Sequence, residues 1–413
     1  MAHWKRSLKI CFVMAVVLFA GQINRDAKVS AAGNKSSKMV QYSSKYYNLY
    51  TDMSKSSIPE IRVRLRVMAE LYYKRTKGFG GVIRSKLNFY MFKNAKDYYA
   101  AGGTRGSAGV YRGMTRGDER SGELLAIVNT SDAWHVVQHE GFHQFVHMAI
   151  RGSIPIWVNE GLAEYFGEAL WTGDSLQTGI IPPRRHKRIV KMMKSKTMLS
   201  LNKLFGMTSE QWSANLDISN YDLAWSVTHF MVHAENGKYK TMFAQFIGDL
   251  ARGKNVKTAW RSRFKVHPDV LEKKYKKWWL GLSEEECKLF YKEATVETLT
   301  SFLVRSRRLN LKFESADDFF AAARSGKINC DPKKHGDLWL PDSLLTGALA
   351  SAKEYSWALE GRYPHQKLIM TDQSGVTFTG EYRISGKKVT VSCKVAAPKK
   401  EAPKTKAKTK SKS

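Results

Sequence analysis

His139-Glu140-Gly141-Phe142-His143 is the stretch of this 413-residue sequence that decides how the chain folds and what it can bind. On a helix, residues four apart are separated by about 6 Å of rise and about 40° of rotation, so the imidazoles of His139 and His143 can reach one metal ion. Glu140 lies about 100° round the helix from His139, beside the ion and not on it. The spacing therefore predicts a helix that carries two metal ligands and a neighbouring general base.

A second block, Asn159-Glu160-Gly161-Leu162-Ala163-Glu164-Tyr165-Phe166, begins sixteen residues after His143. Catalytic zinc takes three protein ligands and keeps one position open for water, so one more ligand is needed. Glu160 is the best candidate, because a short loop and a second helix can fold it back against the first helix. The two blocks together predict a catalytic zinc site.

The alternative is a helix that merely happens to carry histidines, and one observation favours it. His135, His139, His143 and His147 occupy every fourth position. Twelve residues of helix span about 18 Å, so the four side chains cannot all bind one ion. We therefore expect the outer two histidines to be packed, hydrogen-bonded or in contact with the ligands.

The two blocks resemble those of gluzincins, the thermolysin-like zinc metallopeptidases whose third ligand is a glutamate. The second block is also similar to the corresponding stretch of the zinc aminopeptidases in that clan. A longer stretch, roughly residues 41–282, resembles the peptidase-MA-like proteins of uncharacterised function that many bacteria export. The resemblance implies a gluzincin-type fold and a peptidase activity.

The resemblance also implies roles for individual residues. His139, His143 and Glu160 would hold Zn²⁺, and Glu140 would act as the base. Glu164, one turn after Glu160, matches the carboxylate that orients the first histidine and raises its basicity. In the competing assignment, Glu164 is the ligand and Glu160 supports it.

Two departures narrow the class of peptidase. The Gly-x-Met-Glu-Asn segment, with which the aminopeptidases hold a free amino terminus, does not occur in the sequence. The metzincin pattern needs a glycine at position 146 and a histidine at 149, where this chain has Val146 and Ala149. The sequence therefore favours endopeptidase over exopeptidase action and excludes the metzincins.

Peptide hydrolysis also needs an electrophile that stabilises the oxyanion. Tyr221, His229 and His233 lie on one helical segment, and the first two are candidates. The position of Tyr221 relative to similar proteins makes it our choice. The alternative is a buried aromatic residue with a satisfied hydroxyl group.

The first residues predict export from the cytoplasm. Three cations, Lys5, Arg6 and Lys9, precede the apolar run Ile10–Gly21, which is too short to span a bilayer. We expect a signal peptide within residues 1–31, cleaved after Ala20 or near Ser30-Ala31, with an uncleaved anchor as the alternative. The protein would then be periplasmic, envelope-bound or secreted.

The net charge of +31 predicts attraction to polyanions without naming one. Part of it belongs to residues 394–413, which hold eight Lys and one Glu. The stretch Arg184–Lys196 is strongly basic, and we interpret it as a solvated helix face. No specific nucleic-acid module is present, so weak contact with anionic envelope components is the expected consequence.

Removal of the leader leaves three cysteines, Cys287, Cys330 and Cys393. An exported protein can form disulfides, and a Cys330–Cys393 bridge is one alternative. Three buried or reduced thiols are the other. None of the three has the spacing of a metal or redox site.

Hydrophobic periodicity predicts an α+β protein, and 43% hydrophobic content supports a sizeable core. The first lobe should combine a small mixed sheet with the motif helix, followed by a mostly helical second lobe. The predicted strands are Tyr42–Asp52, Leu87–Phe92 and Glu123–Asn129, with a glycine-rich loop at Gly102–Gly117. The predicted helices are Pro59–Thr76, a helix capped by Thr130-Ser131-Asp132 that runs to about Ile150, and Trp157–Leu170, with later breaks at Pro182-Pro183 and Asn236-Gly237.

Changes in composition predict the domain organisation. Residues 32–40 are a linker, 41–282 the zinc metallopeptidase domain, and 283–395 a smaller C-terminal domain of unknown role. The segment Lys367–Val395 alternates like a small antiparallel sheet, with turns at Asp372–Gly375 and Ser385-Gly386. Residues 396–413 form a disordered, Lys-rich tail.

In gluzincins, the strand before the catalytic helix offers an exposed edge on which an extended peptide can lie. The resemblance implies that role for Leu124–Val128, and an ordinary core strand is the alternative. The sequence thus predicts an exported zinc metallopeptidase. The alternatives are an inactive zinc-fold protein that binds polyanions in the envelope, or metal-assisted hydrolysis of something other than a peptide.

Overall fold

The structure is a computed structural model that describes residues 39–76, 85–117, 119–129, 133–150, 152–214, 217–331, 339–386 and 388–398. The expected signal peptide, most of the linker, the capping residues Thr130-Ser131-Asp132 and nearly all of the tail lie outside the described residues. None of the helices within the described ranges is long and apolar enough to cross a membrane.

The described chain forms two compact units. The first contains the described residues up to Trp171 together with Ser175–Phe290. The second contains Thr172–Asp174 and the described residues from Tyr291 onward.

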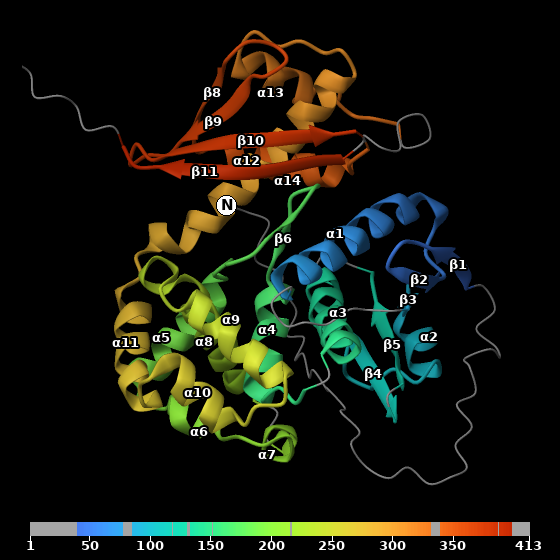
Figure 1. The fold of residues 1–413 in the computed structure, drawn as a ribbon. Coiled ribbons are helices and arrows are strands. Elements are labelled where there is room, and N and C mark those ends of the chain that lie inside the picture. The colour runs from blue at the N-terminus through green and yellow to red at the C-terminus, as the bar shows by residue number, and fades with distance from the viewer. Residues whose placement is uncertain are drawn as a thin grey trace, which may run out of the picture. The chain divides into compact units, whose positions relative to one another are not determined.

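The first unit starts with a five-stranded mixed sheet (Figure 1). Its strands are β1 (Val40–Ser43), β2 (Tyr47–Thr51), β3 (Leu87–Phe92), β4 (Gly109–Arg116) and β5 (Glu119–Ile127). The order is β1-β2-β3-β5-β4, in which β2, β3 and β5 run parallel while β1 and β4 are antiparallel to their neighbours. The predicted strand Tyr42–Asp52 is therefore two strands.

Side chains alternate between the two faces along each strand, so each face of this sheet packs against different helices. On one face, the paired residues Phe89 and Leu124 are fully buried. Helices η1 (Lys55–Ser57), α1 (Ile58–Thr76) and α3 (Ala133–Ala149) belong to this part of the unit, and Tyr72 of α1 packs 5.6 Å from the ring of Phe142 of α3. On the other face, Tyr98 of α2 (Ala95–Ala100) joins a cluster with Phe92 and Val110 among its members.

Strand β4 corrects two expectations. The predicted loop Gly102–Gly117 contains this strand, which forms the edge of the sheet, whereas β5 lies between β3 and β4. The expected exposed edge at Leu124–Val128 is therefore wrong. Glycine is uncommon in strands, so the sequence pattern predicted a loop here. In the structure, the glycines let β4 lie close to α3: a Cβ atom on Gly109 would lie 2.4 Å from Val136 Cγ1, and one on Gly113 would lie 2.7 Å from His147 Nδ1.

The rest of the first unit is mainly helical, as predicted. It contains α4 (Ile156–Gly167), β6 (Leu170–Trp171), β7 (Leu176–Gln177), α5 (Pro183–Lys194), α6 (Leu201–Phe205), α7 (Ser209–Ala214), α8 (Ile218–Gly237), α9 (Lys240–Ala251), α10 (Val256–Phe264), α11 (Pro268–Gly281) and the start of α12 (Glu284–Arg308). Helix α4 ends three residues before the predicted Leu170, which instead begins the short β6–β7 pair. Both predicted breaks are confirmed, since Pro183 starts α5 and the backbone of α8 leaves the helical region at Ala234–Asn236.

In the second unit, the rest of α12 accompanies α13 (Ala316–Arg324), α14 (Asp342–Ala352) and the strands β8 (Ser356–Glu360), β9 (Lys367–Thr371), β10 (Thr377–Ser385) and β11 (Lys388–Ala396). The strands form an antiparallel sheet in the order β11-β10-β9-β8, which confirms the α+β class and the antiparallel C-terminal sheet. Val304 of α12 packs against Val389 and Val391 of β11. Cys287, Cys330 and Cys393 are free thiols, so the disulfide alternative is wrong.

We predict that Gly161 sets the distance between α4 and α8. A Cβ atom at this position would lie 2.5 Å from the backbone carbonyl oxygen of Ala224 and from Thr228 Oγ1. The backbone of α8 can move away only at a cost in free energy. Gly161→Ala should therefore lower the free energy of unfolding by about 1–3 kcal/mol despite the better helix propensity of alanine. Urea denaturation measures the change.

Gly281→Ala is the matched control, because no described atom lies within 4 Å of a Cβ atom built at this helical glycine. Its unfolding free energy should stay equal to the wild-type value or rise slightly. Equal stabilities of the two variants would contradict the importance of the α4–α8 contact.

Candidate metal centre

Two helices bring the predicted metal ligands together. His139 and His143 lie four residues apart on α3, and Glu160 and Glu164 lie four residues apart on α4. Pro155 directly precedes α4 with an extended backbone, and its φ of −54° suits the start of a helix. The turn reverses the chain within a few residues, so the second helix folds back on the first as expected.

Three donor atoms converge at the crossing of these helices. His139 Nε2 lies 3.0 Å from His143 Nε2 and 3.4 Å from Glu160 Oε2, and His143 Nε2 lies 3.5 Å from the same oxygen. Ligands bound tetrahedrally at zinc distances of about 2.0–2.1 Å are separated from one another by about 3.3 Å. The spacing of the three atoms is therefore the spacing of ligands around one small cation.

The burial of Glu160 provides a separate test of this fit. Its side chain is 0% exposed, and neither carboxylate oxygen has a hydrogen-bond donor among the described residues. A buried charge without such partners costs several kcal/mol unless a countercharge accompanies it. His139, His143 and Glu160 can thus hold a metal ion.

The electrostatics of the centre also favour a cation. Burial alone would lower the pKa of His139, but contacts with Glu160 and Glu164 outweigh it and raise that pKa to about 10. Burial alone would raise the pKa of Glu160, but the two imidazoles outweigh it and lower that pKa to about 2. The carboxylates therefore stay ionised and attract positive charge to the imidazole nitrogens.

Glu140 follows His139 on α3 and is close enough to His139, His143 and Glu160 for their charges to affect its pKa. Its two oxygens have different surroundings. Oε2 accepts a hydrogen bond of 2.9 Å from the backbone N–H of Tyr111, whereas Oε1 is buried without a partner among the described residues. Tyr111 belongs to the edge strand β4, which passes close to α3 at Gly109. Burial raises the pKa of Glu140, so the carboxylate has an increased affinity for a proton.

Glu164 contacts the other side of His139. Its Oε1 lies 3.3 Å from His139 Nδ1, and its Oε2 pairs with the guanidinium of Arg185. Burial opposes ionisation, but Arg185 and His139 together hold the pKa of Glu164 well below its usual range. Of these two carboxylates, Glu160 approaches Nε2 of both histidines, whereas Glu164 contacts Nδ1 of His139.

The outer histidines of the stripe have other partners, as expected. His135 Nε2 lies 3.6 Å from Glu164 Oε2. His147 is hydrogen-bonded to Tyr111 Oη at 2.6 Å and to Thr115 Oγ1 at 3.0 Å, which joins the end of α3 to β4.

The two candidate electrophiles of α8 differ in their surroundings. Tyr221 is buried against Trp212, with ring centroids 5.1 Å apart. Burial raises its pKa, and the carboxylates of Glu160, Glu164 and Glu140 are close enough to raise it further. His229 instead bonds to the carbonyl oxygen of Gly179 at 2.8 Å, and burial lowers its pKa to about 4. Of the two, only Tyr221 is affected by the charges of the metal centre.

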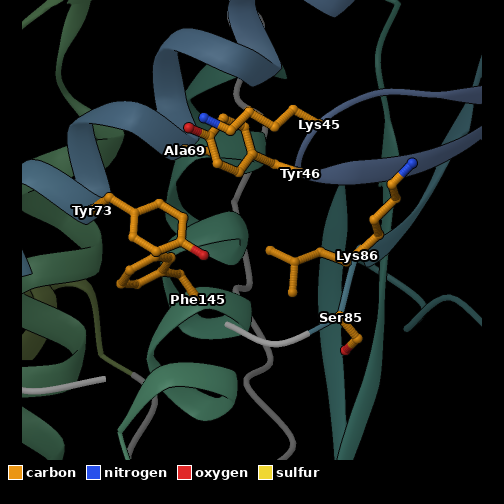
Figure 2. A pocket seen from close by; sticks show the side chains of 8 residues that line it. Lys45, Tyr46, Ala69, Tyr73, Ser85, Lys86 and Phe145 are labelled. Atoms are coloured by element: carbon orange, nitrogen blue, oxygen red, sulfur yellow. The ribbon is translucent and has the colours of Figure 1, made fainter. Parts of the chain in front are cut away.

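A pocket of about 450 Å³ lies elsewhere in the first unit (Figure 2). Its lining residues are Lys45, Tyr46, Ala69, Tyr73, Ser85, Lys86, Leu87 and Phe145. None of them is among the residues predicted for the site, so this pocket and the metal centre are separate features.

Sequence reasoning missed Arg185 and the N–H group of Tyr111. Arg185 lies in the basic stretch that we interpreted as a solvated face, yet it is buried. One signal was present: Arg185, Ile189 and Met193 are four residues apart on α5 and form its buried stripe. A backbone N–H group leaves no such signal in a sequence.

One protein-family model matches part of the chain. Residues 134–256 match a family model described as "Protein of unknown function (DUF1570)". The match covers nearly all of α3 together with α4 and α8, and it includes His139, Glu140, His143, Glu160 and Glu164 but not Tyr111. No curated protein and no solved structure matches the chain.

Proposed function

We propose that this protein is a zinc-dependent metallopeptidase that acts outside the cytoplasm and cleaves peptide bonds within a chain. The position of Glu140 is the main support for this proposal. A cation site alone needs only the three donor atoms, but the buried carboxylate of Glu140 is also present, with one oxygen bonded to Tyr111 and the other without a partner among the residues that the structure describes. That arrangement suits a group that receives and returns protons.

His139, His143 and Glu160 would hold Zn²⁺, and three protein ligands leave a position for water or substrate. When bound, zinc supplies a Lewis acid that polarises a carbonyl group and lowers the pKa of water towards neutrality. Glu140 takes a proton from the attacking water through Oε1 and passes it to the leaving amine. The hydrogen bond from Tyr111 to Oε2 keeps the carboxylate in the required orientation.

The edge strand β4 is the surface that we assign to an extended substrate. Its Tyr111 N–H points to Glu140 and away from the ladder with β5, so a peptide bound along this edge would pass the general base. Tyr221 would then stabilise the oxyanion, since it lies within the electrostatic influence of the same carboxylates.

Glu140→Gln should abolish cleavage and retain the metal. The amide keeps the shape of the side chain but cannot accept the proton, so we expect turnover of a generic protein substrate to fall by about 100-fold or more. Elemental analysis should find the same zinc content as in the wild-type protein. Glu60→Gln, which alters a partly exposed carboxylate paired with Arg64, is the matched control and should leave turnover unchanged. Wild-type rates in Glu140→Gln would mean that another centre carries the chemistry.

Tyr221→Phe should lower turnover with little change in zinc content. Loss of one hydroxyl donor to an oxyanion costs about 100-fold or more in rate. Tyr275→Phe removes another buried hydroxyl group, one bonded to Ser226 at 2.7 Å, and should leave the rate unchanged. Unchanged turnover in Tyr221→Phe would remove this residue from the mechanism.

A specific observation favours a second candidate, a zinc-fold protein that binds anionic envelope components without cleaving peptides. Lys187, Lys191 and Lys194 are exposed along one side of α5, and the helix contains no acidic residue. Such a surface attracts polyanions. Tight polyanion binding together with no hydrolysis of any peptide library would favour this candidate over the peptidase.

A further inference from the structure

Arg185 lies buried next to the metal centre and contacts three carboxylates. Its guanidinium pairs with Glu164, its Nε lies 2.7 Å from Glu168 Oε1, and the same Nε lies 3.7 Å from Asp222 Oδ1. The guanidinium carbon lies 5.4 Å from the ring centroid of Trp225. The side chain is only 11% exposed, so these pairs are shielded from water, unlike ordinary surface ion pairs.

The Glu164 carboxylate is consequently held at both of its oxygens. Oε1 lies 3.3 Å from His139 Nδ1, whereas Oε2 pairs with Arg185. Two partners on opposite oxygens restrict the rotation of the carboxylate plane. A continuous series of contacts therefore runs from α5 through Glu164 of α4 to His139 of α3.

We propose that Arg185 is a positioning residue of the metal centre, which fixes Glu164 so that Glu164 in turn holds His139 with Nε2 directed at the ion. The inference rests on the proposed function, since it concerns how the same site retains its metal. When Glu164 accepts a hydrogen bond from Nδ1–H, the imidazole keeps the tautomer whose Nε2 lone pair is available for coordination.

A planar guanidinium suits this task better than an ammonium group. Its fork of N–H donors engages Glu164 and Glu168 at the same time, whereas lysine offers a single point charge. Without the guanidinium, Glu164 would remain buried, and His135, whose Nε2 lies 3.6 Å from Oε2, is another partner within reach. Rotation towards His135 would release His139.

The contacts also explain a second cluster of donor atoms. His135, Glu164 and Glu168 offer three atoms close enough together for one cation. Arg185 already pairs with Glu164 Oε2 and Glu168 Oε1 in this cluster. The protein's own guanidinium thus supplies the positive charge there.

The test is the zinc affinity of the purified protein, measured by competition with a chromophoric chelator. Arg185→Met keeps an unbranched stem but removes the charge, and we expect it to weaken zinc binding by about 10- to 100-fold, the usual effect of losing an orienting partner. Arg185→Lys should give a smaller loss. Arg188→Met is the matched control, because Arg188 pairs with Asp222 and does not contact Glu164, and it should change the affinity less than about 3-fold.

A double-mutant cycle separates positioning from general stability. If Arg185 acts through Glu164, Arg185→Met should weaken zinc binding less than about 3-fold further in a Glu164→Gln background. Equal effects of Arg185→Met in both backgrounds would overturn the proposal, as would wild-type affinity in Arg185→Met. Should Arg185→Met fail to fold, the same cycle with Arg185→Lys decides between the two outcomes.

The affinity measurement does not depend on peptide hydrolysis, so the two proposals fail in different ways. Tight zinc binding that depends on Arg185, together with no cleavage of any peptide, overturns the peptidase and supports the positioning role. Cleavage that Glu140 controls, together with an affinity indifferent to Arg185, overturns only the positioning role. A wild-type protein that binds no zinc overturns both.

Discussion

Three carboxylates and two imidazoles are packed out of water where α3 meets α4, and the surrounding structure is arranged to balance their charge. Glu140, Glu160 and Glu164 are each at most 1% exposed, and burying an ionised carboxylate costs several kcal/mol unless it is paired. Glu164 has Arg185, and one oxygen of Glu140 has the N–H group of Tyr111. Within the described part of the chain, Glu160 has the two imidazoles as its charge partners and no hydrogen-bond donor, and a divalent cation would correct this imbalance.

The packing of the first unit keeps these groups at contact distance. Gly161 lets α4 approach the backbone of α8, while Gly109 and Gly113 let β4 approach α3. A side chain at any of these three positions would push the two elements in contact there apart and so displace residues of the metal centre. The proposed ligands therefore sit on regular helices, and the proposed general base accepts a hydrogen bond from a strand, which is the rigid support that a preorganised site requires.

The sequence was informative where the chemistry is local and much less so where it depends on tertiary contacts. A four-residue spacing on a helix sufficed to predict that His139 and His143 face the same way, and the short turn before α4 brought Glu160 to them. Strand β4 was mistaken for a loop because its glycines normally weaken strands, and here they serve the approach of α3. Arg185 was taken for a solvated charge because its partners, on α4 and α8, are distant in sequence.

The proposed activity depends on the buried charges of the site and on the edge strand beside it. Arg185, which had been expected in solvent, lies buried next to Glu164, the carboxylate that we propose orients His139. The edge strand β4 restrains Glu140 through Tyr111, and we assign the same edge to an extended peptide. The second unit, with its antiparallel sheet and the larger part of α12, contributes none of the residues named for the metal centre. The chemistry that we propose belongs to the first unit.

The bound zinc per chain, measured by elemental analysis after dialysis against a zinc buffer, tests the central claim most directly. The account predicts one tightly held equivalent in the wild-type protein and its loss in Glu160→Ala, because the three donor atoms share a single ion. Absence of zinc from the wild-type protein, or an undiminished equivalent in Glu160→Ala, would contradict it.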